Sequence, residues 1–238
     1  SSEGKGYWFD DWVLEGTKVE SDPHRAFGPV LGVQYTLSEG TLKMTSQMGP
    51  LGEDDSKVAE LQIQEGTEWT TVASGELNTN GYTIGFRVDG WDRDGDTPFR
   101  VRYSLWEGMQ PVTHHYDGVI HAGVEGDDFV LAAMNCQHIS GGDGTWTSNH
   151  FWWPHQETAD KVAWHEPDMV FFAGDQIYES GLAGIVRTPT NTAVIDYLYH
   201  WNRFLWAFGD LTRRLPSVAI PDDHDVYHGN VWGAGGKA

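Results

Sequence analysis

The chain has 238 residues, of which 39% are hydrophobic and 13% aromatic, so it can bury one large core or two modest ones and is not an intrinsically disordered chain. Its 35 acidic and 15 basic residues give a net charge of -20, which disfavours nucleic acids and anionic membranes as partners unless bound cations neutralise part of it. The single cysteine, Cys136, excludes an intrachain disulfide framework, and no apolar run approaches the roughly 18 residues of a membrane span.

The first part of the chain, residues 1–125, has the pattern of strands separated by turns. Alternating or β-branched segments occupy residues 32–46, 57–78, 81–91 and 97–106, and Gly, Asn, Asp and Ser separate them. In "FRVRYSLW" the alternation places the apolar residues from Phe99 on one face of a strand and the polar residues from Arg100 on the other. We therefore predict an antiparallel β-sandwich module of the fibronectin III or immunoglobulin type.

The second part, residues 126–238, alternates short apolar runs with longer amphipathic stretches. The runs "DFVLAAM", "MVFFA" and "SVAI" are continuous, whereas residues 155–166 and 192–215 have helical spacing. Continuous apolar runs indicate strands that are buried on both faces, and alternation with helices indicates parallel βαβ units. We predict an α/β fold for this part.

Polar side chains follow each of the three apolar runs. In a parallel sheet the carboxyl ends of the strands share one edge, so we expect these clusters to converge there. Thiolate, phenolate, carboxylate and imidazole groups suit transition metals, and the oxygens also suit calcium. The three clusters are Asn135–His138, then Asp175, Gln176 and Tyr178, and then Asp222–Asp225.

Each cluster also has a purely structural interpretation. Cys136 can be a small apolar residue, Asp175 can be a loop or helix-capping acid, and residues 222–225 can form a solvated acidic turn. Three such clusters at one sheet edge, with no cation between them, would place like charges close together. Their concurrence favours a metal site.

These residues resemble those of a known family. "GDQIY" resembles the GDxxY motif of the metallophosphoesterases, "PDDHD" is similar to the DDHE form of their GNH(D/E) motif, and "MNCQH" is similar to the SCQ segment of PhoD-type proteins. The resemblance extends from residue 128 to 233, and the strand-rich part precedes it where PhoD-type proteins carry a small β-sandwich. The chain thus resembles the N-terminal portion of a PhoD-like alkaline phosphatase of the calcineurin-like superfamily, with residues 126–238 as the first part of its α/β domain.

The resemblance implies a role for each matching residue. Asp175 would bridge two metal ions, Cys136 and Tyr178 would bind a ferric ion, and Asp223 would bind the second metal. His224 would lie beside the substrate phosphate as a hydrogen-bond donor or acid, so His224 and Asp175 are the expected catalytic residues.

Four further residues are candidates on weaker grounds. Arg187 follows the GDxxY motif and could bind phosphate. Where PhoD-type proteins have paired Asn, this chain has His228, Gly229 and Asn230, so Asn230 is the expected ligand, with His228 and Asp222 as further candidates.

Together these features predict a metal-dependent phosphoesterase that hydrolyses phosphate esters through a metal-bound hydroxide. The expected cofactors are two or more metal ions, Fe(III) with Ca(II), with zinc or manganese as alternatives. The family completes its metal site with His and Asp from later strands, so we expect a further C-terminal segment or a second chain. We also expect a secreted or periplasmic location. The alternative is a non-catalytic carbohydrate-binding or surface-binding β-sandwich protein with a degenerate phosphatase half, since twelve Trp suit such a role.

Overall fold

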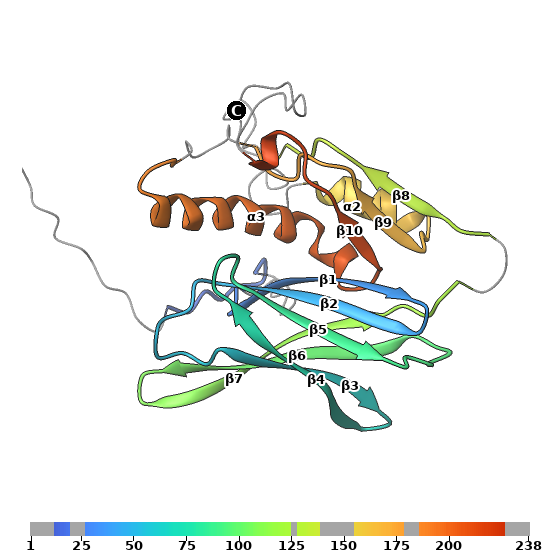
Figure 1. The fold of residues 1–238 in the computed structure, drawn as a ribbon, viewed down its shortest axis with the longest axis horizontal. Helices are drawn as coiled ribbons and strands as arrows, with labels where there is room; N and C mark the ends of the chain where they lie inside the picture. Colours follow the sequence, from blue (N-terminus) through green and yellow to red (C-terminus); the bar gives the residue numbers. More distant parts are fainter. Residues whose placement is uncertain (1–11, 20–26, 125–127, 139–154, 179–185, 227–238) are drawn as a thin grey trace, which may run out of the picture.

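The computed structural model describes residues 12–19, 27–124, 128–138, 155–178 and 186–226 (Figure 1). Its first part is one antiparallel sheet of seven strands in the order β1-β2-β5-β4-β3-β6-β7. The strands are β1 (Val30–Ser38), β2 (Thr41–Met48), β3 (Val58–Glu65), β4 (Glu68–Asn78), β5 (Thr83–Asp89), β6 (Thr97–Glu107) and β7 (Gln110–Ile120).

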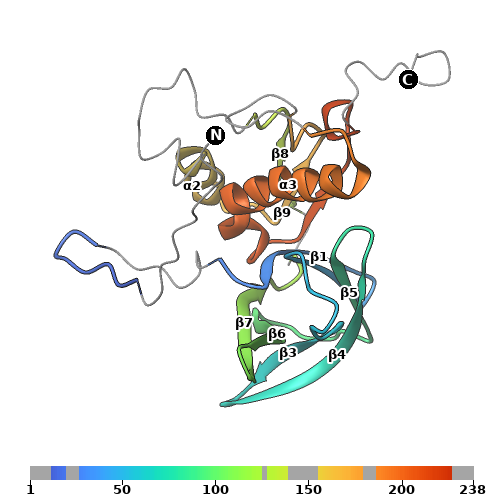
Figure 2. The ribbon, with the colours of Figure 1, turned by 90° about the vertical axis from the view of Figure 1, so that its left-hand side faces the viewer.

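The sheet curls on itself, so that its two edge strands approach each other (Figure 2). β4 serves both halves of the curl, because it pairs with β3 along most of its length and with β5 only at Leu77 and Asn78. The Tyr35 hydroxyl in β1 donates a hydrogen bond to the Val119 carbonyl in β7 at 3.2 Å. The apolar core lies inside this sandwich-like curl, so the prediction of an antiparallel β module is confirmed at this level.

The side chains of β6 follow the predicted alternation. Phe99, Val101 and Tyr103 are buried in the core, and the alternate residues Arg100 and Arg102 are only partly buried. Arg102 forms a salt bridge of 3.1 Å with Glu60 on the outer surface of the sheet. A strand with one face in a core and one toward water has this pattern.

The second part contains a three-stranded parallel sheet with two helices. Its strands lie in the order β10-β9-β8, and both pairs are parallel, as the continuous apolar runs predicted. The elements are β8 (Leu131–Met134), α2 (Gln156–Trp164), β9 (Met169–Phe172), α3 (Thr190–Thr212), β10 (Ser217–Ala219) and the short 3-10 helix η2 (His224–Val226). The predicted boundary between the two parts falls at residues 125–127, outside the described residues.

Only one face of this small sheet is covered by the described residues. Val170 and Phe172 of β9 point into a core with Phe204 and Phe208 of α3, whereas Leu131 of β8 is 48% exposed. The prediction that the strands are buried on both faces is therefore wrong for β8. An apolar run indicates that a strand can be buried, but it does not indicate which other elements cover each face of the strand.

Helix α3 connects the two parts, because it packs on the small sheet and also lies along β1 (Figure 1). Near its middle the approach is close, since a Cβ atom on Gly32 would lie 3.1 Å from the Leu205 side chain. At its end the buried guanidinium of Arg213 lies over the ring of Tyr116 in β7. Within the described segments, no helix is long and apolar enough to cross a membrane.

Candidate metal centre

The loop after β9 turns sharply at two residues with positive φ. Gly174 has φ 104° and Asp175 has φ 57°. A Cβ atom on Gly174 would lie 2.5 Å from the Cβ of Asp222, so only glycine allows the segment after β10 to pass this closely. A non-glycine residue in the left-handed region persists only where its surroundings hold it, and such positions cluster at functional sites. The loop thus presents Asp175 at a fixed position.

The segment after β8 is attached to this loop through the backbone. The N–H of Cys136 donates to the Gly174 carbonyl at 3.2 Å, and the N–H of Gln137 donates to the Asp175 carbonyl at 3.1 Å. Cys136 also has a positive φ, 56°. Two strand ends that the sequence separates by about forty residues are therefore adjacent at the carboxyl edge of the sheet.

Asp225 fastens the segment after β10 to the same loop. Its carboxylate accepts hydrogen bonds from the backbone N–H groups of Asp175 at 2.7 Å, Ile177 at 3.0 Å and Asp222 at 2.9 Å. The residue is 3% exposed. A carboxylate that accepts three N–H groups is satisfied without a cation, so Asp225 holds the two acidic loops together and is not itself an open ligand.

The two oxygens of Asp175 have different surroundings. Oδ2 accepts hydrogen bonds from the Cys136 thiol at 3.4 Å and from the Tyr178 hydroxyl at 3.1 Å. Oδ1 is buried and has no hydrogen-bond partner among the described residues. A buried carboxylate oxygen without a donor is costly, so this atom has the environment of an incomplete ligand.

The phenol of Tyr178 is held in its neutral form by these neighbours. Burial raises its pKa well above the usual value, and the hydrogen bonds with Cys136 and Asp175 raise it further. Both the phenol and the thiol act as donors to one carboxylate oxygen. A cation at this point could replace both protons, since phenolate and thiolate are themselves metal ligands.

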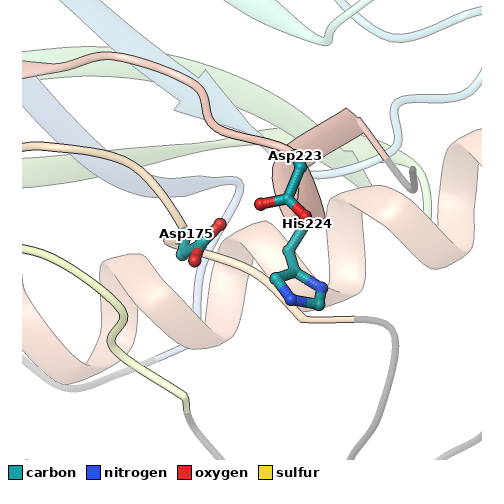
Figure 3. Close-up of side chains that lie close together, drawn as sticks. All are labelled: Asp175, Asp223 and His224. Atoms are coloured by element: carbon teal, nitrogen blue, oxygen red, sulfur yellow. The ribbon is translucent and has the colours of Figure 1, made fainter. Parts of the chain in front are cut away.

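Asp223 and His224 complete the group from the segment after β10 (Figure 3). Potential ligand atoms of Asp175, Asp223 and His224 all lie within 4.8 Å of one another. The His224 ring is 4.4 Å from the Tyr178 ring, between centroids, and the ring of His138 lies 4.6 Å from Tyr178 as well. The three sequence clusters thus meet at one place.

The residues present fit a metal ion. The set combines a carboxylate with an unpartnered buried oxygen, a second carboxylate, an imidazole, a thiol and a phenol, which are the donors that transition metals accept in proteins. Such a group of acids in a chain of net charge -20 would be stabilised by a cation. The geometry brings together Cys136, Asp175, Tyr178, Asp223 and His224.

The remaining predicted residues lie elsewhere or outside the described residues. Asp222 is exposed and accepts a hydrogen bond from the N–H of Asp223 at 2.8 Å. Arg187 is exposed in the segment that leads into α3, and its role in binding phosphate stays a prediction. Asn230 and His228 lie outside the described residues.

Two residues of the site were not singled out as site residues from the sequence, Asp225 and His138. Asp225 stands in the same acidic run as Asp223, and composition gives no means of separating an acid that binds N–H groups from one that faces a cation. His138 follows Cys136 by two residues, so its place in the first polar cluster was the available signal.

Comparison with known proteins identifies no family for this chain. No protein-family model matches the chain, and no curated protein matches it. A chain from the crystal structure of ICOS in complex with ICOS-L and an anti ICOS-L VNAR domain is similar to part of it, with 8% sequence identity, a TM-score of 0.26, and coverage of 37% of this chain and 100% of that chain. A TM-score this low carries no argument about the fold or function of this chain.

Proposed function

We propose that the protein is a metal-dependent phosphoesterase, a phosphoric ester hydrolase in which residues 126–238 belong to a PhoD-like α/β metallophosphoesterase domain. The observation that carries the proposal is the environment of Asp175: one oxygen shared by the Cys136 thiol and the Tyr178 phenol, the other buried without a partner, and Asp223 and His224 beside it.

The metal-holding residues are Asp175, Cys136, Tyr178 and Asp223, with Asn230 as a further ligand. This mixed set favours Fe(III) at the thiol and phenol and Ca(II), or zinc or manganese, at the carboxylates. When bound, the metal ions would supply Lewis-acid activation of water and neutralisation of the phosphate oxygens. This role explains how an acidic protein can bind an anionic ester.

The remaining groups position the substrate and move a proton. His224 is half-buried against the Tyr178 ring, so its imidazole is held at the group. An imidazole placed there can donate a hydrogen bond to a phosphate oxygen or a proton to the leaving oxygen. Asp225 acts through the backbone, since it fixes the loop that carries Asp175.

Metal binding by matched variants tests the proposal. The 238-residue chain is loaded with Fe(III) and Ca(II), freed of excess metal, and analysed for bound metal and for a visible tyrosinate-to-iron absorption band. We expect Asp175→Asn to lose most of the bound metal and Tyr178→Phe to lose the band. Asp94→Asn removes the same charge from an exposed turn and is expected to behave like the unsubstituted chain.

Hydrolysis is measured with p-nitrophenyl phosphate and bis(p-nitrophenyl) phosphate, a monoester and a diester, on variants of the chain together with the C-terminal segment or second chain that is expected to complete the metal site. Activity that depends on added metal and falls in both Asp175→Asn and His224→Ala is the expected result. Equal metal content in Asp175→Asn and Asp94→Asn would show that Asp175 is a structural loop acid, and the proposal would be wrong.

A further inference from the structure

A hollow lies between α3 and the curled sheet. Its volume is about 490 Å³, within the usual range of small-molecule sites. Tyr197, Leu198 and Trp201 line it from the helix, and Val33 and Gln34 of β1 line it from the sheet. The proposed function uses none of these residues.

The hollow lies beside the close contact between Gly32 of β1 and Leu205 of α3, on the side toward the start of the helix. At Gly32 the helix is so close that a Cβ atom would lie 3.1 Å from Leu205. Toward the start of α3 the facing residues are small, including Ala193 of the helix and Gly81 of the turn before β5. Large side chains at these points would fill the space, so the volume depends on small residues.

The lining determines the charge of an occupant. No described residue that lines the hollow is charged, although the chain as a whole carries a net charge of -20. An ion placed there would lose its hydration without gaining a counter-charge, which is strongly unfavourable. A neutral molecule that buries apolar surface against the Leu, Val and Trp side chains gains free energy.

One polar group in the wall lacks a partner. The amide nitrogen of Gln34 is buried and has no hydrogen-bond acceptor within the described part of the chain. By contrast, the amide nitrogen of Gln47, which also lines the hollow, donates to the carbonyls of Met48, Gly81 and Tyr82 at 3.1, 2.9 and 3.0 Å. A small turn of the Gln34 side chain would let it donate to a molecule in the hollow.

We propose that this hollow is a binding site for a neutral, mainly apolar small molecule that carries one hydrogen-bond acceptor, such as an aryl ketone or ester. The inference rests on the lining and on Gln34, and it is independent of the metal centre. The occupant lies between the two parts of the protein, so its binding also stabilises their contact through α3.

Three probes of similar size test the chemistry on the full 238-residue chain by titration calorimetry. The probes are 1-acetonaphthone, which is neutral with a carbonyl acceptor, naphthalene, which has no acceptor, and the anion 1-naphthoate. We expect 1-acetonaphthone to bind about 3- to 10-fold more tightly than naphthalene, as one hydrogen bond provides, and 1-naphthoate to bind least. The proposal is wrong if 1-naphthoate binds as tightly as 1-acetonaphthone.

Two variants locate the site, each with a control. Ala193→Trp fills the hollow and is expected to weaken 1-acetonaphthone binding at least tenfold. Its control is Ile195→Trp, which adds the same indole to the same helix at a residue that is 41% exposed and is expected to leave binding unchanged. Gln34→Leu is expected to remove the preference for 1-acetonaphthone over naphthalene and to leave naphthalene binding intact. Unchanged binding in Ala193→Trp, or an unchanged preference in Gln34→Leu, overturns the proposal whether or not the chain hydrolyses phosphate esters.

Discussion

Replacement of Asp225 by Asn changes one oxygen of a buried carboxylate that accepts three backbone N–H groups. The two bonds to Oδ2, from Asp175 and Asp222, can persist on the amide oxygen but lose their charge assistance. The amide NH₂ then faces the N–H of Ile177, which loses its acceptor. This happens at a buried position, since Asp225 is only 3% exposed. Removal of a buried charge recovers some desolvation free energy, so the losses are partly offset.

The expected net cost is about 3 kcal/mol of stability, because one buried donor is left unsatisfied and two charge-assisted bonds are weakened. For a chain of this size that corresponds to a fall in Tm of about 6 to 12 °C. The same free energy predicts that amide hydrogen exchange at Asp175, Ile177 and Asp222 becomes about 100-fold faster. Both measurements are made on metal-free protein, so they report the hydrogen bonds alone.

Asp222→Asn is the matched control, since Asp222 is exposed and, among the described residues, the N–H of Asp223 is the one donor to its carboxylate. We expect this variant to lose less than about 1 kcal/mol. If Asp225→Asn unfolds at the temperature of Asp222→Asn and its three amides stay protected, then Asp225 does not hold the two loops together. The account of how Asp175 is positioned would then be wrong.

Three further changes test the contact between the two parts and the core of α3. Gly118→Ala would place a Cβ atom 2.4 Å from the Arg213 carbonyl and is expected to cost about 1 to 3 kcal/mol in chemical denaturation, whereas Gly85→Ala, with nothing within 4 Å, costs close to zero. Tyr35→Phe removes a hydroxyl that bonds to the backbone after α3 at 2.9 Å, and we expect a loss of about 1 to 3 kcal/mol by the same method. Burial lowers the pKa of His200, so the unfolded chain takes up a proton before the folded chain does as the pH falls below about 6.5. The unfolding free energy therefore decreases as the pH falls through this range. We expect His200→Leu to show a smaller decrease in unfolding free energy between about pH 7.5 and 5.5.

The sequence is sufficient to predict which strand ends meet, because this follows from the spacing of the apolar residues and from the order of strands and helices along the chain. The runs that end before Asn135, at Gly174 and at Pro221 are short and continuously apolar, and helical spacing separates the second from the third. Parallel strands place their carboxyl ends at one edge, so the contacts of Asp175 with Cys136 and Asp225 follow from the topology.

The parts that could not be predicted depend on distances between layers and on backbone detail. The hollow beneath α3 lies next to the close contact of Gly32 with Leu205, and nothing in the spacing of either segment predicts that contact or the space beside it. The positive φ of Cys136 is also absent from any sequence pattern, since cysteine rarely adopts it. The open outer face of β8 likewise depends on which layers cover it.

The acids at the sheet edge differ in what each of their oxygens contacts, and this difference is why we assign a structural role to Asp225 and propose a metal-binding role for Asp175. Asp225 has three N–H donors and therefore needs no cation. Asp175 is nearly as buried, yet its Oδ1 has no donor among the described residues, and its Oδ2 receives two groups that can each lose a proton to a metal. Because a buried carboxylate oxygen without a partner is costly, the fold has reason to keep Asp175 there only if something else satisfies it. We propose a metal ion held with Asp223 as the partner for that oxygen.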